Sequence, residues 1–78
     1  MNMYQLNCFI TVCRYMSFTK AASQIVITQQ GISKIISRME ELQVPLFHRH
    51  NSTLELTEYG ALLLNSGIKI LREYNSVT

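Results

Sequence analysis

Residues 17–40, with the sequence SFTKAASQIVITQQGISKIISRME, constrain the fold of this chain more than any other stretch. Their pattern predicts two short helices joined by a tight turn. The side chains of Ala21 and Ala22 are small enough for two helices to cross closely at a steep angle. Thr19 is the candidate N-cap of the first helix, and the second helix is expected over about 29–42.

The second helix is expected to be apolar on one side and polar on the other. Thr28 is its candidate N-cap. Its apolar residues recur at helical spacing and are Ile32, Ile36 and Met39, with Ile35 at the edge of the stripe. At about 3.6 residues per turn, the residues that fall together on the polar side are Gln30, Ser33, Lys34 and Ser37.

Two interpretations of this polar side are open on periodicity alone. Its side chains suit the DNA major groove, because Gln pairs with adenine and both Ser and Lys reach bases or phosphates. No carboxylate precedes Glu40 at the far end of the helix. The same composition is also that of an ordinary solvated helix face.

The chain resembles the DNA-binding region of the LysR-type transcriptional regulators, a winged helix-turn-helix family. The match runs from about residue 4 to residue 75 in the same order and spacing. It rests on Ser17, Phe18, Thr19, Ala21, Ala22, Ile25, Gln29, Ser33, Ile36, Met39, Glu40, Leu46, Phe47, Arg49, Leu56, Thr57 and Gly60. The resemblance implies a mainly α fold with a three-helix core, a small β-hairpin wing and a long C-terminal linker helix that dimerises.

The expected organisation is a winged helix-turn-helix DNA-binding domain over residues 1–56 and a linker or dimerisation helix over 57–78. Its first helix is expected over 3–15, with an amphipathic pattern. The wing is expected over 47–56, where Asn51 can adopt a left-handed backbone in place of the usual glycine.

Several positions depart from the family pattern. Met16 stands where glycine is usual, and a positive φ there would be strained. Gln30 replaces a common proline and adds a side chain that can read bases. Gly31 replaces a common alanine, which either lets the backbone approach DNA or weakens the helix start. Gln43 replaces a glycine C-cap in a connection that is one residue shorter, so the pattern does not fix the angle between the recognition helix and the wing.

By resemblance, the recognition helix lies in the major groove and the wing lies on the flanking groove or the phosphate backbone of double-stranded DNA. The residues expected to contact bases are Gln30, Ser33 and Lys34, followed by Gln29 and Ser37. Those expected to contact the DNA backbone are Thr19, Arg38, Arg49 and Thr57. The wing carries Glu55 and few basic residues. This composition predicts a weaker electrostatic attraction to DNA than is usual in the family.

The last helix has two apolar stripes, and Thr57 is its candidate N-cap. One stripe consists of Ala61, Leu64, Ile68 and Leu71. The other, with its flanks, gives the residues expected to form a dimer interface, which are Leu63, Gly67, Ile70, Tyr74 and Val77. A two-fold homodimer would present two recognition helices to an inverted repeat. The alternative is a longer internal core that frays after Leu71.

Composition excludes several classes of function. The chain of 78 residues contains no Asp and no plausible catalytic cluster, so it is not expected to be an enzyme. His48 and His50 lack a third ligand, and Cys8 and Cys13 match no metal spacing, so we expect no metal or cofactor. No small-molecule effector is expected to bind this segment. The two thiols and the absence of a signal peptide or a membrane-spanning run predict a cytoplasmic, nucleoid-associated bacterial protein.

A rival interpretation is a winged-helix protein-interaction module, or a truncated partner that heterodimerises with a full-length regulator. The net charge of only +2 and the acid-bearing wing favour it. It predicts no salt-dependent binding to DNA.

Overall fold

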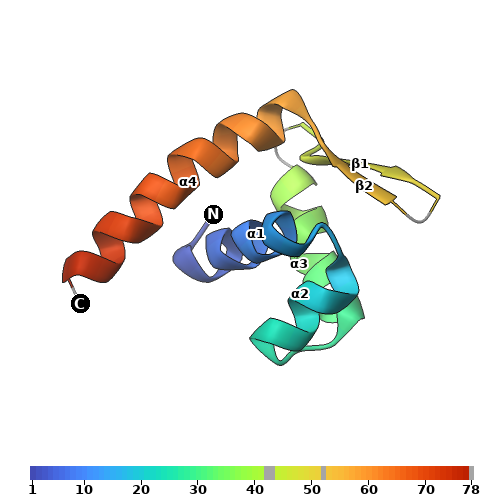
Figure 1. The fold of residues 1–78 in the computed structure, drawn as a ribbon, viewed down its shortest axis with the longest axis horizontal. Coiled ribbons are helices and arrows are strands. Elements are labelled where there is room, and N and C mark those ends of the chain that lie inside the picture. The colour runs from blue at the N-terminus through green and yellow to red at the C-terminus, as the bar shows by residue number, and fades with distance from the viewer. Residues whose placement is uncertain (42–43, 52, 78) are drawn as a thin grey trace.

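The computed structural model describes residues 1–41, 44–51 and 53–77, in which helices surround one central helix and a hairpin projects from one end (Figure 1). The elements in order are α1 (Met3–Tyr15), α2 (Phe18–Ile25), α3 (Gln29–Glu41), β1 (Phe47–His50), β2 (Thr53–Leu56) and α4 (Glu58–Val77). The mainly α winged helix-turn-helix class predicted from the sequence is confirmed. Leu42 and Gln43, where the end of α3 and the altered cap were predicted, lie outside the described residues.

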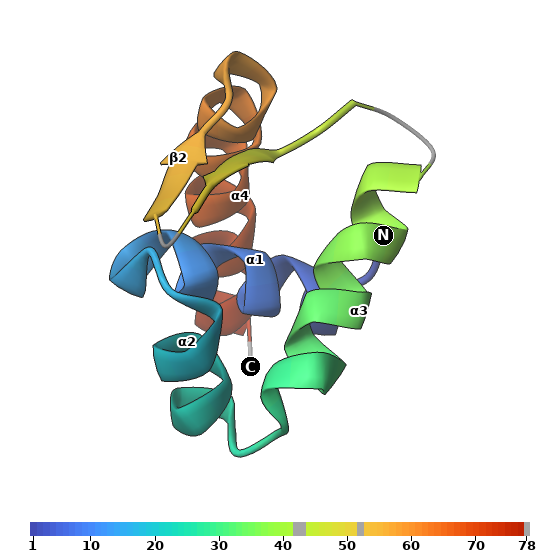
Figure 2. The ribbon, with the colours of Figure 1, turned by 90° about the vertical axis from the view of Figure 1, so that its right-hand side faces the viewer.

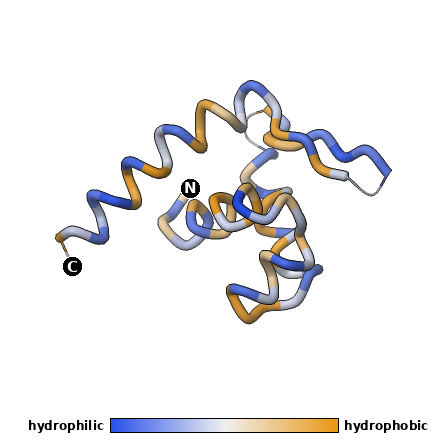
Figure 3. The backbone as a smooth tube through the Cα atoms, viewed as in Figure 1, coloured by the Kyte–Doolittle hydropathy of each residue, from blue (hydrophilic) through white to orange (hydrophobic). Residues whose placement is uncertain are grey.

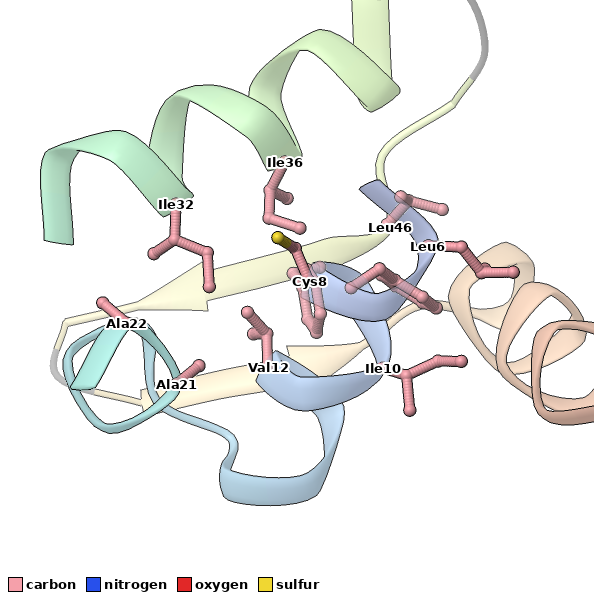
Figure 4. Close-up of a cluster of buried hydrophobic side chains, with 11 residues drawn as sticks. Leu6, Cys8, Ile10, Val12, Ala21, Ala22, Ile32, Ile36 and Leu46 are labelled. Carbon is pink, nitrogen blue, oxygen red and sulfur yellow. The ribbon is translucent and has the colours of Figure 1, made fainter. Parts of the chain in front are cut away.

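Helix α1 is the centre of the fold and contacts α2, α3 and α4. Because it is covered on several sides, buried residues occupy more of its circumference than one stripe. Figure 4 shows Cys8 pointing toward Ile36 of α3, whereas Leu6 and Ile10 point toward α4. The buried core consists of Leu6, Cys8, Phe9, Ile10, Val12, Ala21, Ala22, Ile32, Ile36, Leu46 and Phe47.

Helix α2 begins two residues earlier than the predicted cap implied. The N-cap is Ser17, whose Oγ accepts a hydrogen bond from the backbone N–H of Lys20 at 3.1 Å. Thr19 therefore lies inside the first turn, and the prediction that it caps the helix was wrong. The earlier start makes Phe18 the first helical residue and places its ring 6.1 Å from that of Phe47 in an edge-to-face contact.

Three residues other than glycine adopt positive φ in the described chain, namely Met16 (47°), Val26 (65°) and Asn51 (50°). Met16 ends α1 in the left-handed region, so the turn keeps the backbone of the family glycine despite the strain expected for a side chain there. Asn51 does so at the tip of the hairpin, as predicted. Val26 was not anticipated, and it is the least suited of the three because its side chain is β-branched.

The connection between wing and last helix is organised by Thr57, which is buried. Its Oγ1 accepts the N–H of Gly60 at 2.9 Å, which confirms the predicted N-cap. The same hydroxyl donates to the carbonyl of Pro45 at 2.7 Å, and the Thr57 N–H donates to the carbonyl of Leu46 at 3.0 Å. These bonds fix the start of α4 against the start of β1.

Helix α4 lies along α1 with part of its predicted dimer stripe turned inward. Gly67 is buried, and a Cβ on it would lie 2.8 Å from Cδ1 of Leu6. Leu63 is half-buried and also packs against the core. Gly67 is therefore a close-approach position for α1 and is not part of an exposed face. Ile70, Tyr74 and Val77 remain exposed.

The two buried glycines of α4 should respond differently to substitution by alanine. In Gly60→Ala the new Cβ would clash with the backbone carbonyl oxygen of Leu46, which Thr57 holds in place. We expect Gly60→Ala to lower the free energy of unfolding by about 1–3 kcal/mol.

The matched control is Gly67→Ala, where the clash is with the flexible end of Leu6. A gain in helix propensity of up to about 1 kcal/mol opposes that clash. Chemical denaturation of both variants measures the difference, and equal losses would contradict this account of the junction.

Candidate nucleic-acid interface

The helix-turn-helix is formed by α2 and α3, which contact each other and α1. The Oγ1 of Thr28 accepts the N–H of Gly31 at 2.9 Å, so Thr28 precedes α3 as predicted. Ile32 and Ile36 are fully buried on the inner side of α3. The opposite side carries the predicted polar residues, of which Ser33 is half-buried and Gln29, Gln30, Lys34, Ser37 and Arg38 are exposed.

An open groove of about 430 Å³ lies where the start of α2, the first turns of α3 and the wing meet. Figure 2 views the molecule from the side toward which the hairpin projects, with α2 and α3 below the hairpin. The groove is lined by Met16, Ser17, Phe18, Thr19, Gln29, Ser33, Arg49, Asn51, Thr53 and Leu54. Four residues predicted to contact DNA, from three separate elements, thus line one groove: Thr19, Gln29, Ser33 and Arg49.

The other predicted contact residues are placed differently. Gln30, Lys34, Ser37 and Arg38 are exposed on α3 but do not line this groove. Thr57 is buried, and its only hydroxyl proton goes to the carbonyl of Pro45. The Thr57 side chain thus serves the N-cap and the junction with the wing, and its contact with DNA stays a prediction.

Arg49 on β1 is held by two contacts at the wall of the groove. Its Cζ lies 4.8 Å from the centroid of the Phe18 ring, a cation–π geometry. Its Nη2 lies 3.7 Å from Oε1 of Glu40, with 45% of the Arg49 side chain still exposed. Arg49 therefore keeps donor groups open to the groove while its guanidinium contacts side chains of α2 and α3.

Glu40 is part of the family match, but the sequence analysis gave it no role. Its Oε2 accepts the backbone N–H groups of Leu46 at 2.7 Å and Phe47 at 3.3 Å. A carboxylate in the last turn of a helix is unfavourable toward the helix dipole. The unfavourable position of Glu40 in the last turn of α3 could have indicated, from the sequence alone, that its carboxylate binds a specific partner.

The turn between α2 and α3 is closed by Val26 and Ile27. Both backbone N–H groups donate to the carbonyl of Ala22, the second at 3.0 Å. This closure requires the left-handed backbone at Val26, whose side chain is 86% exposed and gains little from packing. The turn that sets α3 against α2 is therefore made at a conformational cost.

The described residues do not favour metal binding, cysteine chemistry or a membrane span. No group of three or more His, Cys, Asp or Glu side chains among them is arranged to hold a metal ion. Cys8 and Cys13 are free, and burial raises the pKa of the Cys13 thiol to about 12. A thiol protonated at neutral pH is a poor ligand and nucleophile. No helix within the described ranges is both long and apolar enough to cross a membrane.

Comparison with known proteins identifies the family. Residues 3–61 match the family described as "Bacterial regulatory helix-turn-helix protein, lysR family". The chain belongs to this family. This LysR-family chain is 43% identical over 74 residues to the glycine cleavage system transcriptional activator homolog of Haemophilus influenzae, a match that covers 94% of this chain.

Solved structures agree with that assignment. A LysR-family transcriptional regulator from Eggerthella lenta is 42% identical with a TM-score of 0.79, covering 85% of this chain and 96% of that one. The DNA-binding domain of BenM, solved in complex with catB site 1 DNA, is 31% identical with a TM-score of 0.93, covering 99% of this chain and 88% of that one. The chain is a LysR-type DNA-binding domain, of a family of transcriptional regulators and not of enzymes, as the sequence predicted.

This LysR-type chain matches only part of each curated relative. It spans 25% of the length of the Haemophilus protein and 24% of that of the transcriptional regulator YybE of Bacillus subtilis. The similarity therefore concerns about a quarter of each of those two proteins.

The left-handed backbone of Val26 in the turn between α2 and α3 should lower the stability of the domain. Val26→Asn should raise the free energy of unfolding by about 1 kcal/mol, because Asn tolerates the left-handed backbone that valine resists. Ser23→Asn, at an exposed helical position of α2, is the control and should change stability little. Urea denaturation of both variants measures the effect, and a loss of stability in Val26→Asn would show that the valine side chain has a packing role.

Proposed function

We propose that this domain binds an inverted repeat in double-stranded DNA as a homodimer. In this proposal α3 enters the major groove, and the wing follows the flanking minor groove or the phosphate backbone. The observation that carries the proposal is the single groove that brings Thr19, Gln29, Ser33 and Arg49 together from three elements. The absence of any acidic residue before Glu40 favours a polyanionic partner for this side.

Base reading is assigned to the outer side of α3. Gln29 and Ser33 line the groove, and Gln30, Lys34 and Ser37 continue the exposed surface beside it. Gln suits adenine, Lys suits guanine, and Ser suits either bases or phosphates. These side chains have different pairing preferences, which is what sequence discrimination requires.

Affinity is assigned to groups that reach phosphates. Thr19 is exposed in the first turn of α2, where backbone N–H groups favour an anion. Arg49 faces the groove from the wing, and Arg38 is exposed in the last turn of α3. Phosphate contacts of this kind position the domain without reading sequence. The DNA complexes of the similar BenM and CbnR domains support this mode of binding.

Dimerisation is assigned to the exposed side of α4. Ile70, Tyr74 and Val77 follow one another at helical spacing and are 47%, 51% and 86% exposed. Figure 3 shows hydrophobic positions recurring along α4 between hydrophilic ones, with the last turns mostly hydrophilic. A second copy of α4 would cover this surface. Leu63 is half-buried, so only the exposed part of its side chain would contribute to the dimer interface.

Two further assignments complete the proposal. The domain acts in the bacterial cytoplasm at the nucleoid, with neither cofactor nor effector bound to this segment. A second candidate function is heterodimerisation with a longer family member, which the same exposed side of α4 would support. That candidate predicts a folded dimer that does not bind DNA in a salt-dependent way.

Titration against a palindromic A/T-rich DNA library at several salt concentrations tests DNA binding. Arg49→Ala should weaken binding to every sequence and reduce the slope of log affinity against log salt by about 1. Gln30→Ala should change base preference, costing about 1–3 kcal/mol at the preferred site.

The controls are Arg14→Ala on α1 and Gln24→Ala on α2, which are exposed and lie outside the groove. They should bind like the parent. No salt-dependent binding by the folded parent dimer would overturn the proposal in favour of the interaction module.

The dimer proposal has its own test. Ile70→Glu should raise the dimer dissociation constant at least about 100-fold, because a carboxylate would be buried in an apolar contact. Ile68→Glu is the matched control, since Ile68 lies on another side of α4 in a hollow lined by Arg14 and Arg72. Sedimentation equilibrium distinguishes the two variants, and an unchanged mass for Ile70→Glu would exclude this side of α4 as the interface.

A further inference from the structure

We infer that Glu40 is a positioning residue for DNA binding: it ties the last turn of α3 to the start of the wing and holds Arg49 against the groove. This inference rests on the proposed function, in which Arg49 contacts the DNA backbone. Glu40 itself need not touch DNA. Its effect is exerted through the backbone of β1 and through the guanidinium of Arg49.

The two carboxylate oxygens of Glu40 have separate tasks. Oε2 accepts the N–H groups of Leu46 and Phe47, at 2.7 and 3.3 Å. Oε1 faces Nη2 of Arg49 at 3.7 Å. One side chain of the recognition helix thus binds both the backbone at the start of β1 and the basic side chain two residues further along that strand.

The backbone from Pro45 to Phe47 has few other ways to satisfy its N–H groups. Proline has no N–H, and within the described ranges β1 pairs with β2 alone, with Phe47 opposite Leu56. The carbonyls of Pro45 and Leu46 are bound by Thr57 from the start of α4. Glu40 supplies the acceptor for the N–H groups, so the position of β1 relative to α3 depends on this carboxylate.

Arg49 lies on the same side of β1 as Phe47, because side chains two residues apart share a face of a strand. Phe18 contacts both, with its ring 6.1 Å from that of Phe47 and 4.8 Å from Cζ of Arg49. The guanidinium is therefore held by Phe18 of α2 and Glu40 of α3. A long side chain held in place before binding loses less conformational freedom when a phosphate arrives.

If the charge of Glu40 were its only effect, its removal would change DNA affinity in the opposite direction from a positioning role. A carboxylate close to DNA repels phosphates, so its removal should strengthen binding if charge were its only effect. A positioning role predicts weaker binding on removal. The sign of the change in affinity therefore separates the two roles.

The test compares Glu40→Gln with Glu41→Gln in DNA titrations of the full chain. Glu40→Gln keeps an amide oxygen that can accept the N–H groups of Leu46 and Phe47 but removes the ion pair with Arg49. Glu41 is the exposed neighbour in the same turn, and its substitution removes the same charge. We expect Glu40→Gln to weaken binding by about 10-fold, and Glu41→Gln to bind as tightly as the parent or more tightly.

Two further readouts separate positioning from a general loss of structure. In an Arg49→Ala background, Glu40→Gln should cause no further weakening, because the effect passes through Arg49. NMR relaxation of the Arg49 Nε–H group should show that the guanidinium is more mobile in Glu40→Gln than in the parent. It should be unchanged in Glu41→Gln. Circular dichroism and urea denaturation establish that each variant is folded.

Each outcome decides a different point. If the parent binds DNA and Glu40→Gln binds as tightly as Glu41→Gln, the inference is overturned while the proposed function stands. Equal weakening by Glu40→Gln with and without Arg49 also overturns it, since the effect would not pass through that side chain. If the folded parent binds no DNA at any salt concentration, the proposed function fails and the inference fails with it.

Discussion

The backbone of Pro45, Leu46 and Phe47 is the point on which the arrangement of this domain depends. Its N–H groups are bound by Glu40 from α3, and two of its carbonyls are bound by Thr57 at the start of α4. The side chains of Leu46 and Phe47 are buried, with the Phe47 ring 5.5 Å from that of Phe9 in α1. Polar groups thus fix the backbone from two helices while the core fixes the side chains, so the recognition helix, the wing and the last helix share one anchored segment.

Features set by local chemistry were predictable from the sequence. Thr28 and Thr57 precede their helices because a side-chain hydroxyl satisfies an N–H that the first turn leaves unpaired. Asn51 takes the left-handed backbone at the wing tip because its short polar side chain tolerates it. The burial of Ile32 and Ile36 opposite exposed polar residues follows from helical periodicity.

Features set by packing between distant segments were not predictable in this way. Ser17 and Thr19 both offer a capping hydroxyl, and the contact of Phe18 with Phe47 accompanies the choice of Ser17. Gly67 borders two apolar stripes of α4, and periodicity does not say which of them faces α1. The task of Glu40 depends on where residues six and seven positions later return in space. The family pattern supplied the groove residues, but not the way in which they are held.

Helix α4 has a mechanical consequence that follows from its length and its anchorage. Its 20 residues span about 30 Å, and its first turn is bonded to the segment that begins the wing. The helix is held at its start by Thr57 and along its side by packing against α1 that reaches Leu71, so it can shift only as one stiff body. Its start is bonded to the same carbonyls that locate β1 and, through β1, Arg49. A shift of α4 relative to α1 would therefore also change the spacing between the wing and the recognition helix.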